Sequence, residues 1–259
     1  MNVSIVTPTF NRKEILKRSI NSSLELLWKN IVNEIIIVDD ASTDGTVEFL
    51  NKKYYDEINK GVIKVFSLPT NIGVTGAKNY GADFASSEWI VFMDSDDYFI
   101  ENSGNLLCQE LSQLDEYSLV FFRCEDNKGK LIGRYRPASE IKLHELFNIG
   151  TPGECLPVIK KSCLKKYPYY QKLRGCEGLA YFKMLHNGEK AFVSEIVLRK
   201  YDDSGLDRLC TKSAIKKRAK QLFLYNLECL KYIKYASLKK VLSISSRIFY
   251  YAFKTIIPK

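Results

Sequence analysis

Three carboxylates stand within four residues at Asp94-Ser95-Asp96-Asp97, directly after the apolar run 89–93. If that run is a buried strand, the carboxylates leave the sheet at its carboxyl end, where open α/β sheets bind ligands. Crowded carboxylates raise one another's pKa unless a cation shares them. Mg²⁺ and Mn²⁺ accept one or two carboxylates and complete their shell with water and phosphate oxygens. The cluster therefore predicts a divalent metal site for a diphosphate, with a solvated turn or helix cap as the alternative.

Four short β-branched or aromatic runs predict the strands that position this cluster: 3–6, 34–38, 62–66 and 89–93. Helix-like stretches lie between them, at 13–28, from a Thr43-Asp44 cap through Leu50, and at 75–85. Strands that alternate with helices favour a largely parallel, Rossmann-like α/β sheet. No Gly-x-Gly-x-x-Gly follows the first strand, so a dinucleotide cofactor is not expected.

The segments after these strands are polar or rich in glycine. They read Thr-Pro-Thr-Phe-Asn-Arg at 7–12, Asp-Asp-Ala-Ser-Thr-Asp-Gly-Thr at 39–46, Asn-Ile-Gly-Val-Thr-Gly-Ala-Lys-Asn at 71–79, and the acidic cluster at 94–97. The carboxyl ends of parallel strands share one edge of the sheet, so the four segments predict one composite site.

The order and spacing of these segments resemble the family 2 glycosyltransferases of the GT-A fold. Those enzymes have a Pro-x-Tyr/Phe-Asn opening, a Val-Asp-Asp-x-Ser-x-Asp-Gly-Thr loop, an Asn-x-Gly-x-x-x-Ala-Arg-Asn segment and an Asp-x-Asp. The resemblance covers about residues 1–100 and, more loosely, 150–210. It implies a GT-A Rossmann-like nucleotide-sugar-binding fold with a mixed, mainly parallel sheet, and an inverting enzyme that uses a nucleotide-diphosphate sugar.

The resemblance also implies residues for the donor nucleotide. Pro8 and Phe10 match the opening motif, where Phe10 is placed against the uracil face, although a core role would suit it too. Asp40 matches the acid that accepts the base N3–H, and Asp39 before it is expected to be structural. Lys78 stands where the family usually has Arg, so a point charge replaces a bidentate fork near the base or phosphate.

In the Asp-x-Asp segment, Asp94 matches the ribose- or metal-facing acid and Asp96 the direct ligand of Mn²⁺ or Mg²⁺. Ser95, between them, is assigned to the nucleotide-sugar site. Asp97 is expected either to contact the metal ligands without binding the metal or, as the favoured alternative, to cap a helix. The segment after residue 199 resembles a loop that contacts the diphosphate, which assigns Arg208, or less readily Lys200, to stabilising that group.

Inverting transfer needs a base opposite the leaving diphosphate. The family supplies it from a Gly-Glu-Asp-like motif, and here Glu177 keeps the Glu position while Gly178 replaces the Asp. We therefore assign the base to Glu177, with a helix-N-terminal role as the alternative and Glu154 as a rival base. The two histidines, His144 and His186, are expected to have no catalytic role.

The chain has 259 residues, 46% of them hydrophobic and 27% charged, which is typical of a soluble globular protein. Seven scattered cysteines without a Cys-x-x-Cys pair indicate neither disulfides nor a zinc site. Residues 211–259 hold 12 of the 39 Lys and Arg against a single acid, Glu228, while the preceding 210 residues carry a net charge of −2. We predict a catalytic domain at 1–210, with a nucleotide-binding half at 1–100 and an acceptor half at 101–210, and a basic helical tail at 211–259.

Apolar residues alternate with Lys and Arg in the tail, which predicts two amphipathic helices that lie on an anionic membrane surface. Packing of the tail on the catalytic domain is the alternative, and no nucleic-acid partner is expected. No apolar run of about 18 residues and no leader pattern is present, so we expect a cytoplasmic protein, peripheral on the inner face of the membrane.

The predicted reaction moves a hexose from a UDP-sugar, with UDP-glucose or UDP-galactose favoured. The acceptor is expected to be a saccharide linked to a polyprenyl diphosphate. By resemblance, the setting is bacterial O-antigen or capsule synthesis. A sugar-nucleotide nucleotidyltransferase and a non-catalytic sugar-binding module are the alternatives.

Overall fold

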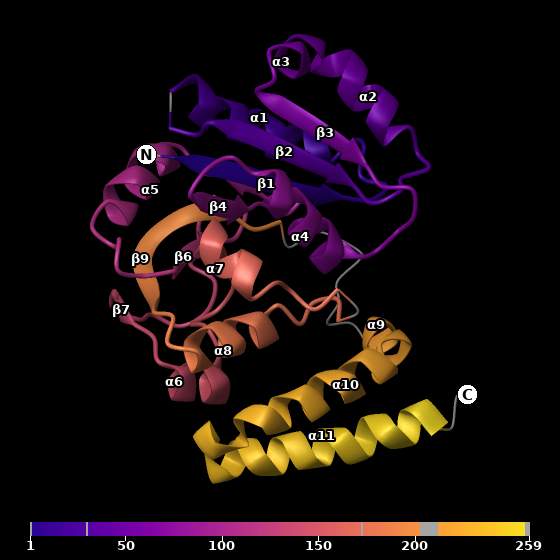
Figure 1. The fold of residues 1–259 in the computed structure, drawn as a ribbon, viewed down its shortest axis with the longest axis vertical. Coiled ribbons are helices and arrows are strands. Elements are labelled where there is room, and N and C mark those ends of the chain that lie inside the picture. Colours follow the sequence, from indigo (N-terminus) through magenta and orange to yellow (C-terminus); the bar gives the residue numbers. More distant parts are fainter. Residues whose placement is uncertain (1, 30, 172, 203–211, 257–259) are drawn as a thin grey trace.

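The computed structural model describes residues 2–29, 31–171, 173–202 and 212–256. These residues form one nine-stranded mixed sheet, with neighbours in the order β3-β2-β1-β4-β8-β6-β9-β5 and β7 paired to β9 (Figure 1). The strands are β1 (Val3–Thr9), β2 (Glu34–Asp39), β3 (Ile63–Ser67), β4 (Trp89–Phe92), β5 (Tyr98–Phe99), β6 (Leu119–Glu125), β7 (Ser139–Glu140), β8 (Cys155–Lys160) and β9 (Ala191–Lys200).

The helices are α1 (Leu16–Trp28), α2 (Thr46–Lys53), α3 (Tyr55–Asn59), α4 (Val74–Phe84), α5 (Ser103–Leu111), α6 (Leu143–Ile149), α7 (Lys161–Lys166), α8 (Gly178–His186), α9 (Lys212–Lys217), α10 (Ala219–Cys229) and α11 (Leu238–Ile256), with a 3₁₀ helix, η1 (Leu230–Tyr235), between the last two.

Strands β1 to β4 form the parallel part of the sheet, and they confirm the four strands predicted from sequence. Every residue of β1, β2 and β4 is buried, because helices cover both faces. Alternate residues of β2 therefore serve two cores: Ile35 and Ile37 pack with α1 and α2, whereas Ile36 and Val38 pack on the side of α4.

Antiparallel pairing begins where β8 joins β4, and β8 also pairs antiparallel with β6. Strand β9 then runs parallel to β6, with register shifts between Phe121 and Cys124. This arrangement brings the chain of the acceptor half alongside the carboxyl end of β4. The GT-A-like, mixed α/β fold predicted from sequence is confirmed.

Helix α4 lies unusually close to the sheet. A Cβ atom on Gly81 would come within 2.5 Å of Val6 and 3.0 Å of Val38, so glycine is needed at this contact. The close approach lets α4 carry Lys78 inward to the end of β4.

Helix α2 begins at Thr46, and Gly45 stands at the capping position that was predicted for Thr43-Asp44. Asp44 accepts the backbone N–H of Thr46 at 3.1 Å, whereas the backbone N–H of Thr43 is donated to Asn11. Of the predicted Thr43-Asp44 cap, only Asp44 bonds to the start of the helix. Thr43 ties the loop to its neighbour.

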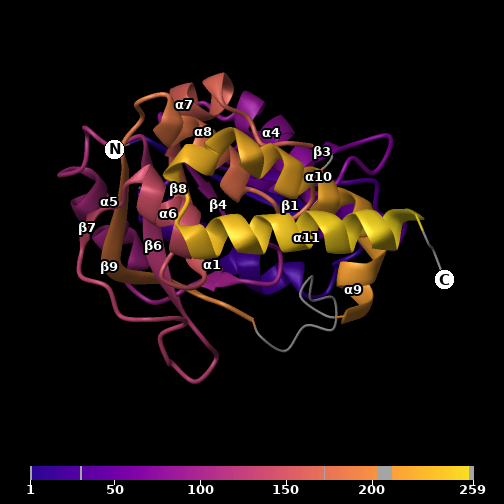
Figure 2. The ribbon, with the colours of Figure 1, turned by 90° about the horizontal axis from the view of Figure 1, so that it is seen from below.

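Helices α10 and α11 lie side by side below the acceptor half (Figures 1 and 2). Tyr232 packs its ring against Phe147 and Phe182. Asn148 donates to the carbonyl of Tyr235 and accepts the backbone N–H of Ser237. The predicted amphipathic helices are present, and Cys229 of α10 and Ile244 of α11 pack into the same core as α6 and α8, as the alternative interpretation of the tail held. None of the helices in the described ranges is both long and apolar enough to cross a bilayer.

Candidate active site

The loops after β1 and β2 are tied together by hydrogen bonds. The backbone N–H of Asn11 donates to Ser42 Oγ at 2.8 Å, and Asn11 Oδ1 accepts the N–H of Thr43 at 2.8 Å. Phe10 stands beside this junction with 44% of its surface exposed, while Pro8 is buried within β1. The junction leaves the Phe10 ring open to stack on a planar ligand.

Asp40 orders the third loop. Its two carboxylate oxygens accept the backbone N–H groups of Ile72 at 2.7 Å and Gly73 at 2.8 Å, at the start of α4. Asp39, which sequence assigned a structural role, accepts the N–H of Ser42 through Oδ2, but among the described residues no donor reaches its buried Oδ1. Two acids at the end of β2 thus hold the loops that surround Phe10, and Asp39 Oδ1 is an unpaired acceptor there.

Lys78 joins the donor and acceptor sides of the site. Its buried Nζ lies 3.0 Å from Asp94 Oδ1 and 3.7 Å from Glu177 Oε1. Burial opposes the ammonium charge, but the two carboxylates outweigh burial and raise the pKa of Lys78 above its usual value. Asp94 and Glu177, which were assigned from two different motifs, therefore meet at Lys78, which was assigned from a third.

Glu177 directly precedes α8, and its side chain makes no capping hydrogen bond to that helix. The carboxylate faces Lys78 instead. Gly178, which replaces the Asp of the family motif, is the first residue of α8. Glu177 is thus an acid at the helix N-terminus, as the alternative interpretation held, and its side chain also points into the site.

Asp96 faces a different cation. Arg12 Nη1 lies 2.9 Å from Asp96 Oδ2, and Arg18 Nη2 donates to the Asp96 carbonyl at 2.9 Å. Arg18 also pairs with Asp202 at 2.6 Å. The end of β1 therefore contacts the acidic cluster through arginine, which was not expected from the motif.

Arg199 is the group that sequence reasoning missed. It is buried at the end of β9, where its guanidinium lies 3.0 Å from Asp97 and 3.5 Å from Asp94. It also lies 3.7 Å from Glu154. One feature of the sequence could have indicated a buried charge here: Arg199 directly follows the apolar run Ile196-Val197-Leu198.

Asp97 is not a helix cap, so that prediction is wrong. A short strand, β5, follows it, and its carboxylate is buried against Arg199. Burial raises the pKa of Asp97 to about 7, although Arg199 acts in the opposite direction. Asp97 Oδ1 also accepts the backbone N–H of Asp202 at 2.9 Å. Asp97 thus holds the acidic loop against β9.

Asp94 is held ionised by its neighbours. Burial would raise its pKa, but Lys78 and Arg199 outweigh burial and keep the pKa below its usual value. Glu154 has the opposite balance, because burial raises its pKa in spite of Arg199. Each of the two acids proposed as bases shares a cation with Asp94. Glu177 shares Lys78, and Glu154 shares Arg199.

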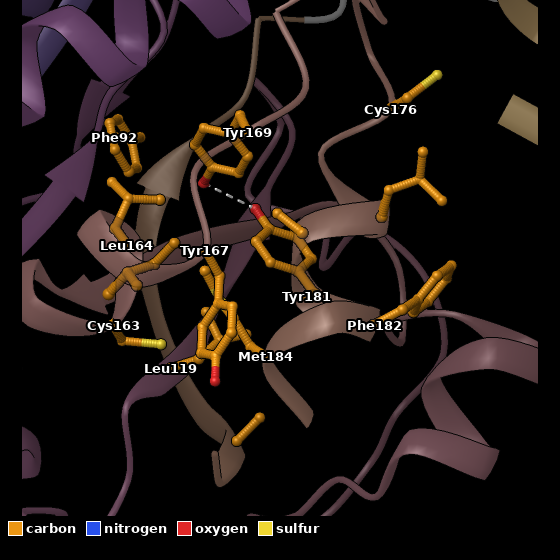
Figure 3. Packing of buried hydrophobic residues seen from close by; sticks show 14 of the residues in the cluster. Phe92, Leu119, Cys163, Leu164, Tyr167, Tyr169, Cys176, Tyr181, Phe182 and Met184 are labelled. Carbon is orange, nitrogen blue, oxygen red and sulfur yellow. Dashed lines mark hydrogen bonds between the residues drawn. The ribbon is translucent and has the colours of Figure 1, made fainter. Parts of the chain in front are cut away.

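Helix α4 also anchors the segment that leads to Glu177. Asn79 donates to the carbonyl of Tyr169 at 2.8 Å and accepts its N–H at 3.0 Å. Tyr169 in turn lies 3.2 Å from the hydroxyl of Tyr181 on α8 and packs on Phe92 (Figure 3). The start of α8 is thus fixed relative to β4.

The other assigned residues are placed as follows. Ser95 is buried between Asp94 and Asp96 in the acidic loop. Lys200 pairs with Glu125 at 3.1 Å. His186 lies against Tyr235 of the tail, and Arg208 lies outside the described residues.

The donor set at the acidic loop fits a hard divalent cation. The side chains of Asp94 and Asp96 are 37% and 30% exposed, so a ligand from solvent reaches both. Within the described ranges, no group of three His, Cys, Asp or Glu side chains converges as a ligand set. Two carboxylates would leave the remaining positions to diphosphate oxygens and water, which is the usual arrangement for Mg²⁺.

Comparison with known proteins identifies the family. Residues 4–166 match the profile of Glycosyl transferase family 2, so the chain belongs to that family. Over 207 residues it is 30% identical to the GalNAc(5)-diNAcBac-PP-undecaprenol beta-1,3-glucosyltransferase of Campylobacter jejuni, an alignment that covers 77% of this chain and 64% of the relative. The chain thus spans under two thirds of that relative's length.

Solved structures share the fold. Residues 1–349 of TarS from Staphylococcus aureus, in complex with UDP-GlcNAc, superpose with a TM-score of 0.69 at 20% identity, over 98% of this chain and 72% of that one. GalNAc-T7 with UDP, GalNAc and Mn²⁺ superposes with a TM-score of 0.61 at 16% identity, over 86% of this chain and 47% of that one.

Proposed function

We propose that the protein is a metal-dependent inverting glycosyltransferase that moves a hexose from a UDP-sugar to a saccharide acceptor. The observation that carries this proposal is the meeting of Asp94 and Glu177 at Lys78, because it joins a donor-side acid to a candidate base. In the reaction, the bond from sugar C1 to the diphosphate oxygen breaks as the acceptor oxygen bonds to C1 from the opposite face, and UDP leaves.

On the donor side, Phe10 stacks on the uracil, with Pro8 buried beneath the same strand end. Asp40 accepts the uracil N3–H through lone pairs that its bonds to the third loop leave available. Lys78 contributes positive charge near the diphosphate. Arg208 is assigned by resemblance to the same group.

Asp96 and Asp94, with Ser95 between them, would hold Mn²⁺ or Mg²⁺ for the diphosphate. When bound, the ion would supply positive charge beside the leaving diphosphate. The hard oxygen donors and their exposure support this assignment.

On the acceptor side, Glu177 takes the proton from the attacking hydroxyl. Its carboxylate lies 3.7 Å from the buried Lys78 ammonium, which also contacts Asp94. Glu154, half exposed at the start of β8, is the second candidate.

We propose a lipid-linked acceptor, a saccharide on a polyprenyl diphosphate, in bacterial surface polysaccharide synthesis. The Campylobacter relative, whose name includes an undecaprenol-linked saccharide, supports this class of acceptor. UDP-glucose and UDP-galactose are the favoured donors.

The outer side of α11 suits an anionic bilayer at the inner face of the cell membrane. Leu238, Leu242, Phe249 and Phe253 are 60–77% exposed, and their spacing places them on one side of the helix. Exposed Lys and Arg flank them at 239, 247 and 254, and α11 contains no acid. Apolar side chains beside basic ones match the composition of helices that bind anionic lipid surfaces.

Vesicle sedimentation tests whether α11 binds an anionic bilayer. The intact chain should sediment with vesicles of phosphatidylglycerol and phosphatidylcholine at low salt, and less at high salt. Replacing Leu242, Phe249 and Phe253 by Ser should abolish sedimentation, whereas Tyr55→Ser, an exposed aromatic outside the tail, should not. If the intact chain stays in the supernatant, the proposed binding of α11 to a bilayer is contradicted. Dimerisation through this side of α11 would contradict it as well.

The reaction itself is tested by incubating UDP-sugars with a short lipid-diphosphate-linked acceptor and measuring the product mass. A product heavier by one hexose, formed only with Mn²⁺ or Mg²⁺, is expected. Release of diphosphate from a sugar phosphate and UTP would instead indicate a nucleotidyltransferase. Binding of sugar without transfer from any UDP-sugar would indicate a sugar-binding module.

A further inference from the structure

Arg199 is a buried cation that contacts acids from both halves of the site. Its Nη1 reaches Asp97 and Asp94 in the acidic loop, and its Nη2 reaches Glu154 at the start of β8. Asp94 and Asp97 follow the donor strand β4, whereas Glu154 belongs to the acceptor half. Neither the family motifs nor the assigned site residues account for this group.

The guanidinium is fixed by further contacts. Its Nε donates to Cys124 Sγ at 3.1 Å, and its Nη2 donates to the Cys155 carbonyl at 3.4 Å. Strand β9 holds the backbone of Arg199 opposite Cys124 and Phe99. Since every nitrogen of the fork has a partner, the guanidinium is held between the carboxylates of both halves of the site.

Asp94 therefore lies between two buried cations, and each cation leads to a different acid of the acceptor half. Lys78 leads to Glu177 and Arg199 leads to Glu154. Residues of one ion-pair network are coupled, because removal of one carboxylate lets the shared cation settle closer to those that remain.

We propose that Arg199 is a positioning residue of the transfer reaction, which couples the metal-facing carboxylate Asp94 to Glu154. This inference rests on the proposed function. When Glu154 loses its charge, the guanidinium of Arg199 settles closer to Asp94, which becomes a weaker ligand for a cation. The acceptor half thereby influences the affinity of the donor half for the metal-bound nucleotide.

The test measures the affinity of the full chain for UDP in the presence of Mn²⁺ by calorimetry. Glu154→Gln should weaken binding about two- to fivefold, the range of partly exposed charge pairs. In an Arg199→Lys background, which keeps the charge and loses the fork, Glu154→Gln should have no further effect. Glu177→Gln, coupled through Lys78, should have the same effect in both backgrounds. Glu195→Gln, an exposed acid on the same strand, is the matched control and should leave binding unchanged.

Equal effects of Glu154→Gln with and without Arg199 would overturn the coupling. Unchanged affinity in Glu154→Gln alone would also overturn it, and this outcome decides the matter even if Arg199→Lys fails to fold. Binding of Mn²⁺ and UDP without coupling contradicts only the role of Arg199. No binding by the natural sequence contradicts the proposed function and this inference together.

Discussion

The loops that surround Phe10 and the two candidate bases are organised by different forces. The loops are joined by hydrogen bonds from main-chain N–H groups to side-chain oxygens, from Asn11 to Ser42, from Thr43 to Asn11 and from Ile72 to Asp40. The acceptor-side acids Glu154 and Glu177 are held through buried cations instead. Main-chain bonds fix a loop before any ligand arrives, whereas charge pairs respond to each change of charge in the site. The loops around Phe10 are thus preformed, whereas the ion pairs of Glu154 and Glu177 change with the charges of the site.

The largest expected effect is at the acidic loop of the donor half. Asp96→Ala should reduce transfer by about 10⁴-fold or more, because a lost metal leaves the departing diphosphate charge unneutralised. Activity with each UDP-sugar is measured with and without excess chelator. Asp83→Ala, an exposed acid on α4, is the control and should retain full activity. Full activity in excess chelator would refute the metal requirement.

The next effect separates the two halves. Glu177→Gln should lower turnover on the order of 10²–10⁴-fold, the usual cost of losing a general base, while UDP affinity changes far less. Steady-state kinetics and calorimetry on the same preparation measure both. If Glu177→Gln keeps natural turnover and Glu154→Gln loses it, the base lies at the start of β8.

A smaller effect concerns the base of the nucleotide. UDP should bind about tenfold or more tightly than CDP, because an ionised acceptor such as Asp40 pairs with uracil N3–H and finds no hydrogen on cytosine N3. Calorimetry with UDP, CDP and GDP measures this preference. Equal affinities would show that Asp40 does not read the base. Loss of the preference in Asp39→Asn alone would assign the reading to Asp39 Oδ1.

The smallest effect on chemistry is expected at Glu34, which stabilises the donor half away from the site. Burial opposes its charge, but bonds from Lys64, Ser4 and Ser86 outweigh burial and lower the pKa to about 2. A lowered pKa stabilises the fold above about pH 4.5, and this stability is lost as pH falls towards 2. Glu34→Gln should lower the free energy of unfolding at pH 7 by about 2–3 kcal/mol, with natural turnover. A destabilisation that does not shrink between pH 4.5 and 2 would contradict this origin.

Much of the donor half was determined by sequence alone. Four apolar runs of strand length gave all four parallel strands, because a buried parallel strand needs apolar residues on both faces. The polar segments after those strands then had to meet at one edge of the sheet, and the resemblance to the family assigned Phe10, Asp40 and Asp94 within that site. The family followed from the same motifs, because their order along the chain is itself specific.

Only the tertiary structure decided the partners of the charged groups. Arg199 comes 105 residues after Asp94, and a register between β6 and β9 with two shifts brings it to the acidic loop. Asp97 resembled a helix cap because local sequence does not reveal that a strand follows or that a distant guanidinium lies opposite. The sequence of the tail likewise predicts amphipathic helices but not which side of them faces the rest of the protein. The contacts of Tyr232 with Phe147 and Phe182 identify that side. Strand and helix patterns arise from neighbours in sequence, whereas ion pairs depend on side chains that only folding brings together.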